Sequence, residues 1–221
     1  MSQFVDSYYI LEQMIEKSTN ADLTMNPAEV PDFRHMEWNQ KLVDTRHIFE
    51  IRESVKDYDS SNTIQYNDLL NILQYNYQFS KQFPVLNQIP VEQMVIMERV
   101  EGAKNTRAFY SYKPELQLLE EKYLLPDYRD KKDIVIQEEF AHAGAIVIFV
   151  MALREVTERY GERGYKEVIQ NIGALGHYTW LQSLAFGYEG TVFAGFLQKS
   201  LREFTDIDGY NKSQVFSYAF G

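Results

Sequence analysis

The sequence contains no cysteine among its 221 residues. Disulfide bonds, thiolate metal ligands and thiol nucleophiles are therefore excluded. Basic residues are also scarce, because 22 Lys and Arg stand against 32 Asp and Glu and leave a formal net charge of −10. Such an acidic chain is a poor match for nucleic acid or for an anionic membrane surface, and we expect neither as a partner.

Long hydrophobic runs are missing as well. The longest, AGAIVIFVMAL at 143–153, is too short to span a bilayer. The first residues, MSQFVDSYYILEQMIEK, mix acidic with apolar side chains and lack the basic start of a signal peptide. We therefore expect a cytoplasmic protein.

Aromatic residues are plentiful, with 16 Tyr and 14 Phe in a chain that is 45% hydrophobic, which indicates a packed globular protein. Its alternating helical and extended patterns predict an α+β fold. An N-terminal helix and extended arm (1–44, with the helix at 3–17) precede the main domain (45–221). Further helices are predicted at 64–79, 134–142, 165–186 and 198–204. Strands are predicted at 93–100, 108–113, 145–153, 191–196 and 214–220, and a loop at 80–90.

The four histidines of the chain are its candidate metal ligands. Glu139 and His142 lie three residues apart in EEFAH, which puts a carboxylate and an imidazole on one face of a helix. A di-iron carboxylate site needs two such pairs, and the sequence holds one. His35, His47 and His177 show no ligand spacing, so we expect no metal site. The glycine patterns of nucleotide-binding loops and of serine hydrolases are also missing.

The segment IRESVKDYD at 51–59 carries Arg52, Ser54 and Lys56 at alternate positions. If the segment is extended, the three side chains project to one side. Two cations and a hydroxyl in this arrangement suit a phosphate or a polarised carbonyl. The residues alone leave a second interpretation open, a solvated strand edge of mixed charge.

These segments resemble a known family. IRESVKDY is similar to R-x-S-x-(R/K)-x-(F/Y), the opening of the nitroreductase superfamily. The stretch RYGERGYKEVIQNIGALGHYTWLQSLAFGYEGTVFAGF at 159–196 resembles one branch, the SagB-type dehydrogenases. Their pattern is (K/R)-Y-G-x-R-G-Y-R, then an apolar helix with G-H near its middle, then a strand that ends in G-G-F. The resemblance covers roughly residues 45–221.

The resemblance implies a nitroreductase-like fold, with a mostly antiparallel central sheet flanked by helices and FMN at a homodimer interface. It implies that Arg52, Ser54 and Lys56 hold the phosphate and ring edge of FMN. Gly195 would let the backbone approach the isoalloxazine ring closely. The catalytic Lys–Tyr pair of the family falls at Arg159–Tyr160.

The activity that the resemblance implies is oxidation of thiazoline or oxazoline rings in a ribosomally made peptide. Such a ring loses a hydride, which FMN takes, and a proton, which needs a base. Tyr160 is expected to transfer the proton, because Arg159 stays charged; Lys166 is the next candidate. The implied partners are an azoline-containing precursor peptide and a second copy of the chain. A complex with the ring-forming cyclodehydratase is left open.

Three departures from the family pattern keep other functions open. FPVLNQIP at 83–90 replaces a loop of small residues, Ala194 replaces the first glycine of G-G-F, and Arg159 stands where the family has lysine. One alternative is a general NAD(P)H-dependent nitro or quinone reductase of the same fold. Another is a non-catalytic paralogue that binds a partner enzyme.

Overall fold

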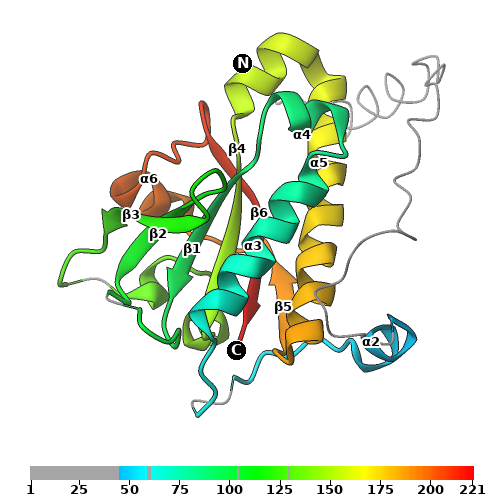
Figure 1. Cartoon of the computed structure of the whole chain (residues 1–221). Helices are drawn as coiled ribbons and strands as arrows, with labels where there is room; N and C mark the ends of the chain where they lie inside the picture. Colours follow the sequence, from blue (N-terminus) through cyan, green and yellow to red (C-terminus); the bar gives the residue numbers. More distant parts are fainter. Residues whose placement is uncertain (1–44, 59–60, 104, 129) are drawn as a thin grey trace, which may run out of the picture. The chain divides into compact units, whose positions relative to one another are not determined.

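The computed structural model describes residues 45–221 except 59, 60, 104 and 129 (Figure 1). The predicted helix at 3–17 lies outside the described residues, and the division after residue 44 stays a prediction. No helix in the part of the chain that is described has the length and hydrophobicity needed to cross a membrane.

A six-stranded sheet forms the centre of the described domain, in the order β3-β2-β1-β4-β6-β5, and every neighbouring pair is antiparallel. The strands are β1 Glu92–Met97, β2 Ala108–Lys113, β3 Leu118–Leu124, β4 Ala145–Met151, β5 Gly190–Phe193 and β6 Ser213–Phe220. The predicted class, an α+β fold with an antiparallel sheet flanked by helices, is confirmed.

Helices cover both faces of this sheet. α3 and α5 lie side by side on one face, while α6 and two short 3-10 helices lie against a cluster of buried residues on the other (Figure 1). Every residue of β4 is therefore buried, which explains its unbroken apolar sequence. The helices are α2 Thr45–Ile51, α3 Tyr66–Ser80, α4 Pro84–Gln88, η2 Lys131–Asp133, η3 Glu138–His142, α5 Leu153–Phe186 and α6 Gln198–Phe204.

The long helix α5 begins at Leu153, well before the predicted start at Tyr165. It contains a kink at Gly161, whose φ of 63° and ψ of −157° are not helical. Gly164 is buried one turn later, and a Cβ there would overlap the Cβ of Tyr160. The prediction was wrong because the two glycines suggest a break in the helix, whereas they allow a kink and a close approach within it.

Three other predictions need correction. The predicted loop at 80–90 contains α4, whose Val85 and Leu86 are buried in the core. Of the predicted helix at 134–142, only Glu138–His142 is helical, as a 3-10 turn. The edge strand β3 was not predicted, because its sequence LLEEKYL has no regular apolar alternation and its side chains are mostly exposed.

Candidate functional site

The segment with Arg52, Ser54 and Lys56 follows α2 and runs beside the edge strand β5. Ser54 forms a parallel bridge with Gly190, and the backbone N–H of Val55 donates to the Gly190 carbonyl at 3.3 Å. The side chains of Arg52, Ser54 and Lys56 are all exposed. The backbone is therefore extended at this point, and the two cations and the hydroxyl are open to a ligand.

Arg52 lies against the C-terminal half of α5. Its guanidinium carbon is 4.7 Å from the centroid of the Trp180 ring, a cation–π contact. Trp180 is buried, and its indole N–H has no hydrogen-bond partner among the described residues. His177, one helical turn earlier, has its ring centroid 6.5 Å from that of Trp180. Burial, and then the charge of Arg52, lower the pKa of His177, so its imidazole is mainly neutral at pH 7.

Lys56 and Gly195 both reach the segment that leads into η3. The Lys56 ammonium lies 4.0 Å from a carboxylate oxygen of Glu139. The Gly195 carbonyl accepts the backbone N–H of Ile136 at 2.8 Å. A Cβ at Gly195 would meet Ile136 no closer than 3.4 Å, so packing within this chain does not require glycine there.

Arg159 and Tyr160 lie in the first part of α5, directly before the kink. The Tyr160 hydroxyl donates to Gln88 Oε1 of α4 at 2.5 Å. The Arg159 guanidinium lies 3.6 Å from a carboxylate oxygen of Glu155, one turn earlier, and is half-exposed. Tyr160 is therefore held by a residue of α4, and Arg159 is paired with a residue of α5 itself.

The predicted site residues thus form two groups at opposite ends of α5. Arg52, Ser54, Lys56 and Gly195 gather around β5 and the 136–139 segment. The Arg159–Tyr160 pair lies beyond Gly164, which precedes Trp180 by 16 residues. At a rise of about 1.5 Å per residue, that helical stretch alone is about 24 Å long. One chain by itself does not bring the two groups together.

Three residues beside Arg52 and Lys56 were not predicted as site residues from the sequence: His177, Trp180 and Glu139. Trp180 gave no sequence signal, because it reads as one more apolar residue of a buried helix. His177 was visible in the G-H pattern, and Glu139 was weighed only as a metal ligand. Among the described residues, no three His, Asp or Glu side chains converge as a metal ion would require.

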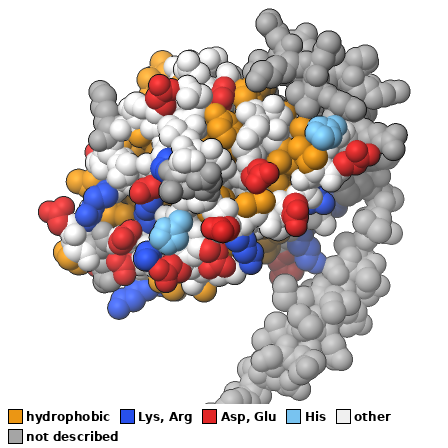
Figure 2. Space-filling model, turned by 90° about the horizontal axis from the view of Figure 1, so that it is seen from below, with side chains coloured by type: hydrophobic (Ala, Val, Ile, Leu, Met, Phe, Trp, Pro, Cys, Tyr) orange, Lys and Arg blue, Asp and Glu red, His pale blue; other side chains and the backbone are white. Residues whose placement is uncertain are grey.

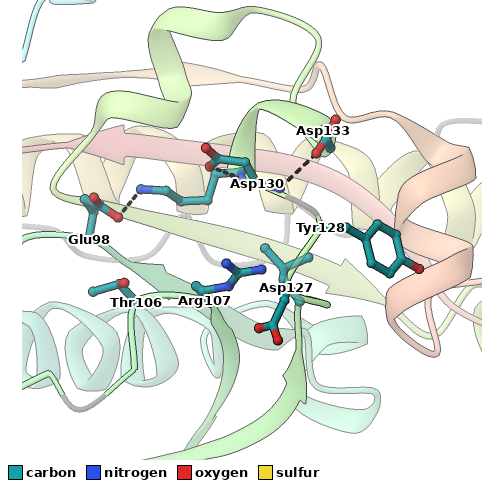
Figure 3. A pocket seen from close by; sticks show the side chains of 9 residues that line it. Glu98, Thr106, Arg107, Asp127, Tyr128, Asp130 and Asp133 are labelled. Atoms are coloured by element: carbon teal, nitrogen blue, oxygen red, sulfur yellow. Dashed lines mark hydrogen bonds and ion pairs between the residues drawn. The ribbon is translucent and has the colours of Figure 1, made fainter.

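A separate hollow of about 380 Å³ contains none of these residues (Figure 3). Four of its charged side chains have partners within the adjacent structure. The Lys131 ammonium donates to Glu98, Asp130 accepts the Lys131 backbone N–H at 2.5 Å, and Asp133 accepts the Asp130 backbone N–H at 2.8 Å. Asp130 and Asp133 also form a capping box for η2, in which each carboxylate accepts the backbone N–H of the other residue, so these residues have a structural role.

On the face shown in Figure 2 the surface charge is mixed rather than segregated. Figure 2 shows one face of the molecule, on which acidic and basic side chains alternate over its described part and form no continuous basic band. The cations at 52 and 56 therefore form a local feature of an acidic chain, which suits a single small anion better than a polyanion.

Comparison with known families identifies the fold. The model of the nitroreductase family matches residues 50–221, so the chain belongs to the nitroreductase family. No curated protein sequence matches the chain.

Solved structures with this fold are distant in sequence. A protein from Anabaena variabilis that is assigned as a nitroreductase has a TM-score of 0.66 at 18% identity; the match covers 83% of this chain and 39% of that one. A chain in the E. coli microcin synthetase McbBCD complex with truncated pro-MccB17 bound has a TM-score of 0.60 at 15% identity, over 96% of this chain and 91% of that one. A protein from Exiguobacterium sibiricum that is assigned as a nitroreductase was solved in complex with FMN. It has a TM-score of 0.51 at 14% identity, and the match covers 82% of this chain and 89% of that one.

Proposed function

We propose that this chain is an FMN-dependent dehydrogenase that oxidises thiazoline or oxazoline rings of a ribosomally made peptide. The observation that carries the proposal is the gathering of Arg52, Ser54, Lys56 and Gly195 around β5. Two relatives support it by analogy: the Exiguobacterium protein binds FMN, and the microcin synthetase complex holds a peptide. The match to the microcin synthetase chain extends over nearly the full length of both chains.

The residues around β5 fit FMN chemically. Arg52 and Lys56 supply two exposed cations and Ser54 a hydroxyl, the donor set that a phosphate prefers. The indole N–H of Trp180 is a buried donor beside them without an acceptor among the described residues. Packing within the chain does not require glycine at position 195, so we propose that the glycine is there to let a planar ring approach the backbone. When bound, FMN supplies a hydride acceptor.

Tyr160 is proposed to take the proton of the azoline ring as its phenolate, after the hydroxyl has released its own proton to solvent. Its hydroxyl is already held by Gln88, so the phenol has a fixed position and Gln88 acts as a positioning residue. Arg159 keeps its charge and cannot take the proton itself. Its role is to stabilise negative charge near the phenol while the proton moves.

The two groups of residues are proposed to meet between two copies of the chain. In a two-fold symmetric dimer, each surface patch faces the equivalent patch of the partner. Two α5 helices that run antiparallel across such an axis place the N-terminal end of one beside the C-terminal end of the other. Each site would then take Arg52, Ser54 and Lys56 from one chain and Tyr160 from its partner.

The substrate is proposed to be a precursor peptide whose rings were formed by a cyclodehydratase. The chain would then work beside that enzyme; by analogy, the related chain is found within the McbBCD complex. A thiazoline is the product of cyclisation and dehydration of a cysteine, and its oxidation removes two further hydrogen atoms to give the thiazole.

The test is direct oxidation of a thiazoline-containing peptide by the purified chain supplemented with FMN. Mass spectrometry should report the loss of two hydrogen atoms per ring, with oxygen returning the cofactor to its oxidised form. If every ring stays unoxidised while NADPH is consumed with a quinone, the chain is a general reductase. If the chain neither retains flavin nor turns over, it is a partner-binding subunit and the proposal fails.

A further inference from the structure

Strands β1 and β2 separate at one end of their shared ladder. Their paired residues run from Ile96 opposite Phe109 to Met94 opposite Ser111, and the ladder stops there. Beyond this point Glu92–Gln93 still pairs with β4, and Tyr112–Lys113 still pairs with β3. The two strand ends therefore form a fork in the middle of the sheet.

A cavity of about 420 Å³ opens at this fork, next to the C-terminal end of α3. Its walls include two aromatic rings, Tyr77 and Tyr112, and two prolines, Pro90 and Pro114. Tyr112 is buried and its hydroxyl donates to Gln74 at 2.7 Å, so its ring is held in place. Rigid rings and prolines of this kind offer apolar contact at little cost in side-chain entropy.

The wall of the cavity includes a glutamine whose amide oxygen has no donor among the described residues. Gln93 lines the cavity and is 5% exposed. Its Nε2 donates to the Leu73 carbonyl at 3.0 Å, which fixes the orientation of the amide, because a flipped amide would put two oxygens in contact. Its Oε1 is buried and has no hydrogen-bond partner among the described residues. A buried acceptor of this kind destabilises the free chain unless something donates to it.

The rim of the cavity carries charges of both signs, and Lys113 is already paired with Glu120 at 3.2 Å. Lys81, Lys113 and Lys122 line it against Glu92 and Glu115. Glu92 is already neutralised, since it receives the Lys212 ammonium at 2.9 Å and lies 3.8 Å from Lys122. Lys81 lies 4.7 Å from the centroid of the Tyr77 ring and has no ion pair within the described part of the chain.

We propose that this fork binds a short extended peptide segment that carries an acidic side chain. A backbone N–H of the peptide donates to Gln93 Oε1, the carboxylate binds Lys81, and an apolar side chain lies between Tyr77 and Tyr112. Strand ends that lack a partner are the usual place where an extended peptide adds to a sheet.

The position of the fork connects it to the candidate base. Pro90, in its wall, is two residues from Gln88, which holds the Tyr160 hydroxyl. A peptide held here would lie near Tyr160, so the fork would be a subsite for the precursor peptide. Only this link rests on the proposed function; the binding of a peptide does not.

The experiment measures binding of a fluorescein-labelled peptide, Ala-Val-Glu-Val-Ala-amide, to the full chain by anisotropy, without FMN or an azoline. The same peptide with Gln in place of Glu is the matched probe. We expect saturable binding of the Glu peptide, and binding of the Gln peptide that is weaker by about fivefold.

Variants locate the contacts. Lys81→Gln should weaken the Glu peptide to the level of the Gln peptide and leave the Gln peptide unchanged, whereas Lys199→Gln on α6 should change neither. Gln93→Met should weaken both peptides; because it removes the bond of Nε2 to the Leu73 carbonyl as well as the unpaired acceptor, urea unfolding of this variant is measured alongside to separate lost binding from lost stability. Equal binding of the two peptides, or no saturable binding at millimolar peptide, would overturn the inference. Binding without ring oxidation would refute the proposed function and leave this site in place.

Discussion

The guanidinium carbon of Arg52 lies 4.7 Å from the centroid of the Trp180 ring, so a residue at the end of α2 is held against the C-terminal half of α5. The contact keeps a cation in a fixed place beside β5 even though the side chain of Arg52 is exposed. It also explains why Arg52 and His177 affect each other electrostatically.

Replacement of Arg52 with Ala should therefore weaken FMN binding by about tenfold or more, because one charge-assisted contact to the phosphate is lost. Flavin retained per chain after gel filtration, followed by its visible absorbance, measures the effect. Arg154→Ala is the matched control, since Arg154 is an exposed arginine of α5 whose side chain, among the described residues, pairs with Glu158. Equal flavin content in the two variants would remove Arg52 from the site.

His177 should make the fold sensitive to acid. Its pKa in the folded chain lies below the usual 6.5, by burial and then by the charge of Arg52, so the unfolded chain binds the proton more tightly. Stability is therefore expected to fall as the pH drops below about 6.5. Urea unfolding at about pH 8 and about pH 5 measures this loss, and Arg52→Ala should make it smaller.

The imidazole titration of His177, followed by NMR, checks the same relationship independently. Its pKa should rise toward the usual value in Arg52→Ala but should not reach it, because burial remains as the larger cause. A pKa that does not respond to the loss of Arg52 would contradict the placement of the two side chains.

Glycine is required at position 190 but not at position 195. A Cβ at Gly190 would lie 2.7 Å from the Tyr218 hydroxyl and would also collide with the backbone of β6. Gly190→Ala should lower the free energy of unfolding by about 2 kcal/mol. Gly195→Ala should change it by less than about 0.5 kcal/mol and should instead weaken flavin binding. Urea unfolding and flavin content of the two variants separate a structural glycine from one that faces a ligand.

Local patterns predicted much of the fold. The strand at 108–113 and the helix at 198–204 were placed correctly, because their side-chain periodicity alone determines the element. β3 was not predicted, because this edge strand exposes charged residues and lacks the apolar alternation of a half-buried strand. The true start of α5 could not be read from the sequence, since it depends on how Gly161 bends the helix.

The candidate site was predictable residue by residue but not in its arrangement. The alternation of Arg52, Ser54 and Lys56 was visible in the sequence, and the bridge of Ser54 to Gly190 gives that segment its extended backbone. The distance from this segment to Tyr160 was not visible, because it is set by the length of α5 and by the packing of α2 on its far end. Trp180 was missed because it reads as one more apolar residue of a buried helix, and only the structure shows its contact with Arg52.

The central claim is that each active site takes Arg52 from one chain and Tyr160 from its partner. Two inactive variants, Arg52→Ala and Tyr160→Phe, should then restore each other when unfolded, mixed and refolded together at limiting FMN. Random pairing makes half of the dimers mixed, each with one intact site, so about a quarter of the parent rate of thiazoline oxidation should return. A mixture that stays as inactive as its two components would contradict the account.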